Sequence, residues 1–317
     1  MRHLVLGSGP VGLATAVALQ ARGESVRLVS RRRPAALPPG VEHLALDVLD
    51  ATAMATVRDV DVVHQCLNAA YHRWATDFPP LQAAAVALIR RLGARLVSFE
   101  NLYPYGAPRA EAFRETDAFA PCSEKGRVRT AMIEALQREP GLQVAHVRAS
   151  DLFGPGMHGS ALGGEVIGRA CDGLAPRLLG DPDALHTWTY VADAGETMAR
   201  VALAPSPWGK AWHVPSAPAC SQHEIVARLG RLLGRELRAS VTPALVLRLV
   251  GLVRPEAGAL VEMLYEFRAP FVMADEVTRA QLGQAHTPLD AALAATVASF
   301  TPRRTPAPSS TATPAPR

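Results

Sequence analysis

Three glycines near the N-terminus have a spacing that suits phosphate binding. The segment "VLGSGPVGLA" places Gly7, Gly9 and Gly12 between an apolar run and a helical pattern. The first glycine permits a tight turn, the second lets the backbone approach a pyrophosphate, and the third lets helix and strand pack closely. The N–H groups that start the following helix would attract the phosphates. We therefore predict a dinucleotide site that includes Pro10 and Val11, with an ordinary Gly-rich turn as the alternative.

Arginines follow the next apolar run, at a place where many dinucleotide sites carry an acid. In NAD and FAD sites an Asp or Glu there holds the ribose 2′-hydroxyl. This chain has Ser30 followed by Arg31, Arg32 and Arg33. Because arginine binds phosphate through planar, bidentate contacts, we predict NADP, with NAD as the second choice. Arg31 is the expected 2′-phosphate contact, with Ser30 and Arg32 as helpers. A solvated basic loop is the alternative.

Further cofactor contacts are expected where later strands end, since ligands of such sheets bind at the carboxyl ends of the strands. Asp47 and Val48 follow the expected third strand and would lie beside an adenine. Asp47 could equally be a surface turn residue. Asn68 and Ser98, from the fourth and fifth strands, complete the predicted cofactor set.

Alternating strands and helices must position these residues. Apolar runs predict strands at 3–7, 25–30, 41–48, 60–68, 94–100 and 142–150, and helical patterns lie at 10–22, 74–92 and 123–138. This rhythm predicts βαβ units, a parallel sheet and an α/β fold of the Rossmann type, doubly wound. After the segment "GPG" at 154–156, the regular alternation of strands and helices ends. We therefore expect a dinucleotide-binding domain at 1–155 that shares some elements with later segments. A smaller α+β substrate domain is expected at 156–300.

Composition narrows the class of protein. Of the 317 residues 49% are hydrophobic and 20% are charged, as in a globular protein. The net charge is +4, but the Pro/Ala/Thr-rich segment 301–317, which we expect to be disordered, holds Arg303, Arg304 and Arg317 and no acid. No nucleic-acid partner is therefore expected. No apolar stretch reaches the roughly 18 residues of a membrane helix, so no membrane association is expected.

The cysteines and histidines form no recognisable site. The four cysteines lie apart without a CxxC, which favours a reducing, cytoplasmic location over a disulfide framework. The ten histidines show no metal-ligand spacing, so no metal is expected. His158 and His186 are minor candidates for proton transfer, although a loop histidine is more often a surface residue. Tyr71, His72 and Arg73 follow the fourth strand, where cofactor or substrate contacts are usual.

From the fifth strand onward the sequence resembles the extended short-chain dehydrogenase/reductase family, whose members are also called NAD-dependent epimerase/dehydratase-like proteins. "LVSFENLYPYG" resembles that family's fifth strand and "YG" turn. "RASDLFGPG" at 148–156 is similar to its "R..N.YGPG" segment, and "HTWTYVADAGETMARVAL" to its "VxD" segment, with Val191 and Asp193. "AWHVPSAPACSQHEIVARLGRLLG" resembles the strand and helix that follow. Together with the glycine loop, the resemblance covers about residues 1–235 in the expected order.

The resemblance implies a catalytic pair that this chain lacks. The family uses Tyr-x-x-x-Lys on the helix after the fifth strand, where the Lys charge lowers the Tyr pKa and the phenol relays a proton. Here Lys125 falls at the tyrosine place and Arg129 at the lysine place, and Asn101 replaces a Ser or Thr. The glycine loop is also shorter than the family's Gly-x-x-Gly-x-x-Gly form. The chain is therefore most similar to atypical members of the family.

Substitute residues could carry the chemistry. Lys125 could exchange a proton if burial beside Arg129 lowered its pKa, or both could form a solvated helix face. Tyr103 and Tyr105 are phenols that could replace the missing acid/base, or they pack against the loop. Asn101 ends a strand and could bind a substrate carbonyl, or cap the loop.

The resulting hypothesis is an atypical, NADP-preferring oxidoreductase of this class. It would transfer hydride at a carbonyl or alcohol carbon of a small, sugar-like or polyketide-like substrate. One alternative is a catalytically inactive protein that senses NADP. A flavin-dependent oxygenase is disfavoured, because no acid ends the second strand and no later Gly-Asp segment follows. Members of the resembled family often form dimers through two packed helices. The resemblance therefore implies a homodimer as one possible oligomeric state.

Overall fold

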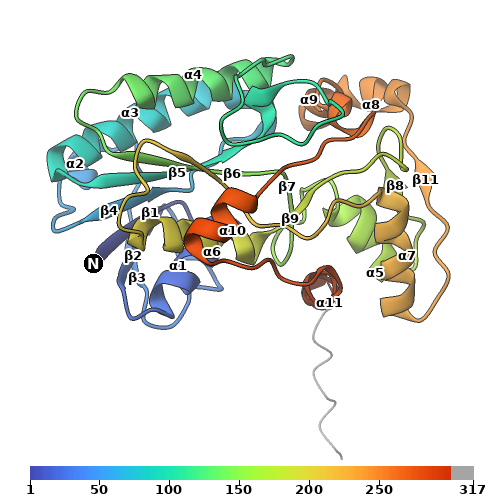
Figure 1. Cartoon of the computed structure of the whole chain (residues 1–317), viewed down its shortest axis with the longest axis horizontal. Coiled ribbons are helices and arrows are strands. Elements are labelled where there is room, and N and C mark those ends of the chain that lie inside the picture. Colours follow the sequence, from blue (N-terminus) through green and yellow to red (C-terminus); the bar gives the residue numbers. More distant parts are fainter. Residues whose placement is uncertain (301–317) are drawn as a thin grey trace, which may run out of the picture.

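A seven-stranded parallel sheet forms the centre of the computed structural model, which describes residues 1–300 (Figure 1). The predicted tail at 301–317 lies outside the described residues. The strand order is β10-β6-β5-β4-β1-β2-β3, so the order reverses between β1 and β4, where doubly wound sheets bind ligands. The strands are β1 (Arg2–Leu6), β2 (Ser25–Ser30), β3 (Glu42–Ala45), β4 (Val62–Gln65), β5 (Arg95–Asn101), β6 (Val144–Ala149) and β10 (Ala211–His213). The predicted Rossmann-type α/β fold is confirmed.

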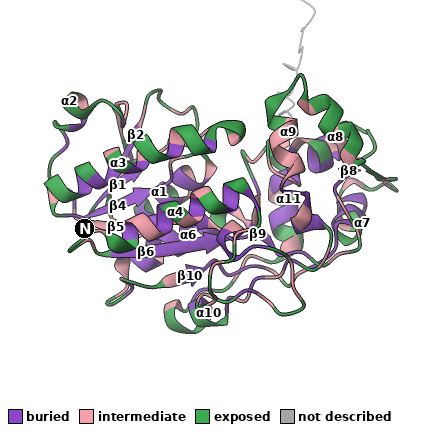
Figure 2. Cartoon of the chain, turned by 90° about the horizontal axis from the view of Figure 1, so that it is seen from above, coloured by how far each residue is buried: buried purple, intermediate pink, exposed green. Residues whose placement is uncertain are grey.

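Helices cover both faces of the sheet (Figure 1). One face carries α1 (Pro10–Gln20) and α6 (Val191–Leu203), and the other carries α2 (Ala51–Met54), α3 (Trp74–Leu92) and α4 (Glu124–Arg138). Strands buried on both faces must be apolar at successive positions, which explains their continuous apolar runs. The buried residues accordingly lie in the strands and on the helix faces that pack against them, while the outer faces of the helices are exposed (Figure 2).

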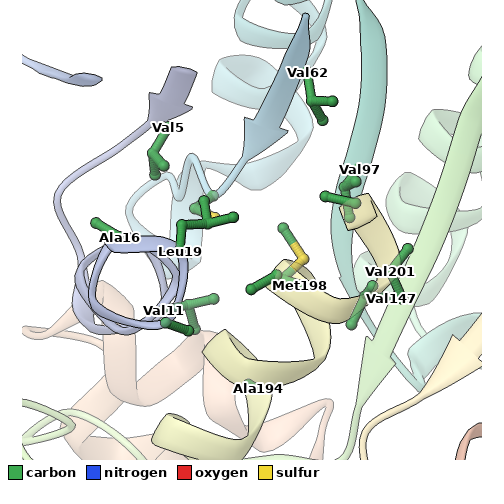
Figure 3. Packing of buried hydrophobic residues seen from close by; sticks show 14 of the residues in the cluster. Val5, Val11, Ala16, Leu19, Val62, Val97, Val147, Ala194, Met198 and Val201 are labelled. Atoms are coloured by element: carbon green, nitrogen blue, oxygen red, sulfur yellow. The ribbon is translucent and has the colours of Figure 1, made fainter. Parts of the chain in front are cut away.

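The packing between α1 and α6 depends on small residues. Figure 3 shows Leu19 of α1 and Met198 of α6 together beside Val62 and Val97 of the sheet. A Cβ atom added at Gly195 of α6 would lie only 2.4 Å from the backbone of α1. The close approach of the two helices therefore requires glycine at this position, and it ties a later segment of the chain to the glycine-loop helix.

The rest of the chain builds a smaller region with its own apolar cluster, which includes Phe153, Trp188, Ile225 and Phe267. Four helices of this region lie together beyond one end of the sheet (Figures 1 and 2). They are α7, α8, α9 and α11, whose bounds follow. The elements here are β7 (Asp151–Phe153), η3 (Gly163–Gly168), α5 (Arg169–Cys171), β8 (Arg177–Leu178), β9 (Trp188–Tyr190), α7 (Gln222–Leu233), β11 (Ser240–Val241), α8 (Ala244–Gly251), α9 (Pro255–Val261), η4 (Leu264–Phe267) and α11 (Leu289–Phe300).

Later segments of the chain contribute elements to the layers of the sheet. Both α6 and β10 come from later sequence and yet belong to the sheet layers, and α10 (Glu276–Leu282) packs beside β10. The strand β10, which lies within the range 156–300 expected for the substrate domain, thus forms one edge of the main sheet. Within residues 1–300, no helix is both long and apolar enough to cross a membrane.

Candidate functional site

The glycine loop has the geometry of a phosphate cradle. Gly7 turns with a φ of +103°, and a Cβ atom there would lie 2.7 Å from the Cys66 carbonyl oxygen. A Cβ atom on Gly12 would lie 2.0 Å from the carbonyl oxygen of Gly7. Gly9, by contrast, has nothing within 4 Å of its Cβ position, and the helix α1 begins directly after it at Pro10. The loop therefore opens only at Gly9, in front of the helix N-terminus, and fits a pyrophosphate.

The end of β2 presents cationic side chains beside this loop. Arg31 and Arg32 are exposed, and neither forms an ion pair within residues 1–300. The Ser30 hydroxyl donates to the Arg32 carbonyl oxygen at 2.8 Å and lies 3.0 Å from Nε2 of His43 on β3. Ser30 and His43 thus fix the backbone of the arginine loop. Sequence reasoning missed His43, whose position in an expected strand gave no indication of this contact.

The other predicted cofactor residues have different surroundings. Asp47 accepts a hydrogen bond from the Leu49 amide at 3.0 Å, as in a local turn. Val48 is buried in the apolar cluster under α2 and α3, and Ser98 is buried within β5. Asn68 is exposed just beyond the carboxyl end of β4. Of the four, Asn68 has the placement that best suits contact with a ligand.

Lys125 is buried in the first turn of α4, and its charge is already paired. Its Nζ forms an ion pair with Glu262, whose other oxygen accepts from the Glu124 amide at 3.0 Å. The same Nζ lies 4.6 Å from the centre of the Tyr71 ring, within cation–π range. The lysine is therefore neither part of a solvated helix face nor free to exchange a proton without breaking this ion pair. Lys125 instead joins α4 to the segment after β4 and to the C-terminal region.

Two phenols meet beside Lys125. Tyr71, in the short helix η1 (Tyr71–Arg73), has its hydroxyl 3.2 Å from that of Tyr103, in η2 (Tyr103–Tyr105). Burial raises the pKa of both phenols well above their usual range, and the nearby Glu266 carboxyl acts in the same direction. Both are therefore neutral at physiological pH and can donate hydrogen bonds, but neither is poised to act as a phenolate base.

Tyr105 lies in the core. Its hydroxyl accepts from Arg148 at 2.7 Å and contacts Nε2 of His213 at 2.9 Å, and burial raises its pKa to about 12. Arg148 in turn donates to Glu100 at 3.1 Å. Burial would raise the pKa of Glu100, but His146 and Arg148 outweigh it and hold the pKa at about 2. This placement favours a supporting role for Tyr105 beneath the site.

Arg129 and Asn101 also make local contacts. The buried Arg129 guanidinium donates to the Phe99 carbonyl oxygen at 2.8 Å and lies 5.2 Å from the centre of the Phe78 ring. Asn101 accepts from the Tyr103 amide at 3.3 Å, which matches the loop-capping alternative. Asn101 nevertheless ends β5 at the carboxyl edge of the sheet, next to the two phenols.

Two carboxyl groups that sequence reasoning missed complete the cluster. Asp151 begins β7 directly after β6, and its Oδ2 lies 2.8 Å from Nε2 of His186. Glu266 of η4 is 1% exposed, and its Oε1 has no hydrogen-bond partner among residues 1–300. Asp151 stands where the resembled "R..N.YGPG" segment has Asn, a departure that could have identified it. Glu266 carried no such indication. His158, the other histidine candidate, is exposed and packs against Phe300.

Fold and site together define a class of protein: a Rossmann-type protein with a glycine loop suited to a dinucleotide and a polar cluster at the carboxyl edge of its sheet. A sequence model of the NAD dependent epimerase/dehydratase family matches residues 3–213, and the chain belongs to this family. The predicted resemblance is thereby confirmed. No curated protein sequence matches the chain.

Solved structures of similar fold include epimerases and a dTDP-glucose 4,6-dehydratase from Streptomyces venezuelae. The UDP-glucose 4-epimerase of Thermotoga maritima has a TM-score of 0.77 at 16% identity, over 95% of this chain and 98% of that chain. A putative epimerase from Burkholderia cenocepacia J2315 has a TM-score of 0.73 at 24% identity, over 94% and 97%. The UDP-glucuronic acid 4-epimerase of Bacillus cereus, solved with UDP-glucuronic acid and NAD, has a TM-score of 0.76 at 14% identity, over 95% and 99%. At these identities the likeness concerns the fold.

Proposed function

We propose that this protein is an NADP-preferring oxidoreductase of the epimerase/dehydratase class that acts on a small carbonyl or alcohol substrate. The observation that carries the proposal is the glycine loop, which opens only at Gly9 before the N-terminus of α1 and lies beside the exposed, unpaired Arg31 and Arg32. When bound, the nicotinamide would supply or accept a hydride. A sugar-like substrate is supported by the structurally similar epimerases, which are named for UDP-sugars.

The cofactor would be held by backbone and by arginine. The N–H groups at the start of α1 would receive the pyrophosphate, and Gly9 would let it approach. Arg31 would bind the 2′-phosphate through its planar guanidinium, with Arg32 beside it and the loop fixed by Ser30. No carboxylate ends β2 to hold a free ribose 2′-hydroxyl, so this arrangement favours NADP over NAD.

The substrate oxygen would meet hydrogen-bond donors. Tyr103 follows β5 and contacts Tyr71, and both phenols are neutral. One of them can donate to a carbonyl or hydroxyl oxygen while the other holds it in place. Asn101 lies two residues before Tyr103 and is a further candidate for this contact. Lys125 contributes by fixing Tyr71, since Glu262 already pairs its charge.

Turnover on a substrate panel tests this proposal. Purified protein would be mixed with NADPH and with ketones, aldehydes and keto-sugar nucleotides, and NADPH oxidation would be followed by absorbance. We expect oxidation with at least one carbonyl compound, and a strong decrease in the Tyr103→Phe variant. Tight NADPH binding without oxidation by any panel member would favour the NADP-sensing alternative, which the absence of Tyr-x-x-x-Lys supports.

A further inference from the structure

We propose that the outer face of α8 docks the protein on an anionic lipid surface, with leucines entering the acyl region and arginines meeting the headgroup phosphates. The inference goes beyond the proposed function and does not depend on hydride transfer. It departs from the sequence-based expectation of no membrane association, which rested on the length that a spanning helix needs. A helix that lies along a lipid surface needs one apolar face instead of a spanning length.

One face of α8 is apolar and exposed. Leu245 and Leu249 are four residues apart, and Leu252 follows at the C-cap of the helix, so the three side chains form one stripe. These leucines are 65%, 58% and 82% exposed, and the adjacent Val253 is 80% exposed. The helix lies at the outer edge of the molecule and is coloured mainly as exposed (Figure 2). Single exposed leucines are common, but a contiguous group of large apolar residues indicates an interaction surface.

The opposite side of α8 is held by packing, so the stripe points away from the molecule. Leu247 packs against the apolar cluster of the C-terminal region. A Cβ atom added at Gly251 would lie 2.6 Å from the Cα atom of Gly258, so α8 and α9 are in backbone contact. Glu262, at the C-cap of α9, is paired with Lys125 of α4. These contacts fix the two helices and present the leucines to the outside.

The charges around the stripe favour an anionic partner. The segment 237–255 contains Arg238, Arg248 and Arg254 and no Asp or Glu. All three arginines are exposed, and none of them forms an ion pair within residues 1–300. Cations beside an apolar surface are attracted to the negative charge of anionic lipids. A bilayer that contains such lipids therefore complements both the leucines and the arginines.

A second copy of the chain is a less suitable partner. Arg248 follows Leu245 by three residues and directly precedes Leu249, so it lies on the same face as the leucines. In a symmetric dimer through this face, Arg248 of each copy would be buried in an apolar interface, and segment 237–255 offers no acid to pair with it. On a lipid surface, the stem of Arg248 can lie among acyl chains while its guanidinium reaches the phosphates.

Co-sedimentation of the full-length protein with vesicles tests the proposal. We expect the protein to pellet with vesicles of phosphatidylglycerol and phosphatidylcholine, and to bind vesicles of phosphatidylcholine alone much more weakly. Replacement of both Leu249 and Leu252 by Ser should weaken binding to the anionic vesicles at least about tenfold. Replacement of both Arg248 and Arg254 by Gln should weaken it about fivefold for each arginine removed.

Leu232→Ser and Arg231→Gln are the matched controls, because both residues are exposed on α7 and lie outside the stripe. These variants should bind vesicles like the wild type. All the substitutions replace exposed side chains, so the Tm of each variant should match that of the wild type. Absence of wild-type binding to the anionic vesicles, or binding that survives the double leucine replacement, would overturn the proposal.

Sedimentation equilibrium without vesicles tests the second copy as the partner. We expect the double leucine replacement to leave the oligomeric state unchanged. A wild-type dimer that this replacement dissociates, in a protein that does not bind anionic vesicles, would overturn the lipid proposal and assign the stripe to a subunit interface.

Discussion

At the scale of single residues, charge determines what the protein can bind. The Arg31 guanidinium is exposed and has no ion-pair partner within residues 1–300. An unpaired cation beside a phosphate cradle is well placed to recognise one additional phosphate. We therefore propose that Arg31 favours NADP over NAD, since the two cofactors differ only at the ribose 2′ position.

Replacement of Arg31 by Ala should weaken NADPH binding far more than NADH binding. A hydrogen bond to a charged group contributes about 1.5–3 kcal/mol, so we expect a roughly 10- to 150-fold increase in the Kd for NADPH. Fluorescence titration measures both affinities, and Arg238→Ala, an exposed arginine of the C-terminal region, is the control. An equal loss for both cofactors would refute the role assigned to Arg31.

Replacement of Glu266 by Gln should change the pH dependence of stability. The pKa of Glu266 is raised in the folded protein from its usual value of 4.5. Above that pH the folded protein retains a proton that the unfolded chain releases, so wild-type stability falls as pH rises. The variant lacks this decrease. Its Tm should therefore rise relative to the wild type as pH increases above 4.5.

The control for this measurement is Glu236→Gln, since Glu236 is exposed. Its Tm should follow the wild type at every pH. A Tm difference between Glu266→Gln and the wild type that stays constant from pH 4 to pH 9 would show that Glu266 ionises as an ordinary glutamate in the folded protein.

At the scale of elements, two variants of the glycine loop should distinguish an effect on cofactor binding from an effect on stability. Gly9 has a φ of −68° and an open Cβ position, so Gly9→Ala should leave Tm nearly unchanged and still weaken cofactor binding. Gly12→Ala should lower both the Tm and the affinity for the cofactor, because the added Cβ would lie 2.0 Å from the Gly7 carbonyl oxygen. Thermal unfolding and NADPH titration compare the two variants. Unimpaired NADPH binding by Gly9→Ala would contradict the proposed approach of the pyrophosphate.

The elements whose residues follow a local pattern could be predicted from the sequence, and the contacts between distant residues could not. The strands and helices up to residue 150 follow local apolar patterns, and their observed bounds lie close to the predicted ranges. The contact between Asp151 and His186 does not follow such patterns, because the two residues are 35 positions apart in the sequence and meet only in the folded chain. Likewise, no local pattern could show that Glu262 pairs with Lys125.

At the scale of the whole molecule, later segments complete the sheet. The apolar residues of α6, among them Met198, are buried against α1 and the strands, and β10 is the edge strand beside β6. A fragment of residues 1–155 would expose this face, and each buried aliphatic side chain contributes about 1.5–3 kcal/mol. We expect the fragment to lack cooperative unfolding in urea as followed by circular dichroism. A fragment that unfolds cooperatively and binds NADPH would contradict this expectation.

The chain as a whole belongs to an NAD-dependent family, and we propose that its catalytic groups differ from the Tyr-x-x-x-Lys pair of that family. The proposed hydride transfer requires that the dinucleotide binds first. Fluorescence titration of the purified protein with NADPH, NADH and FAD tests that requirement most directly. We expect saturable binding of NADPH, weaker binding of NADH and no binding of FAD. The absence of NADPH binding, or tighter binding of FAD, would contradict this expectation.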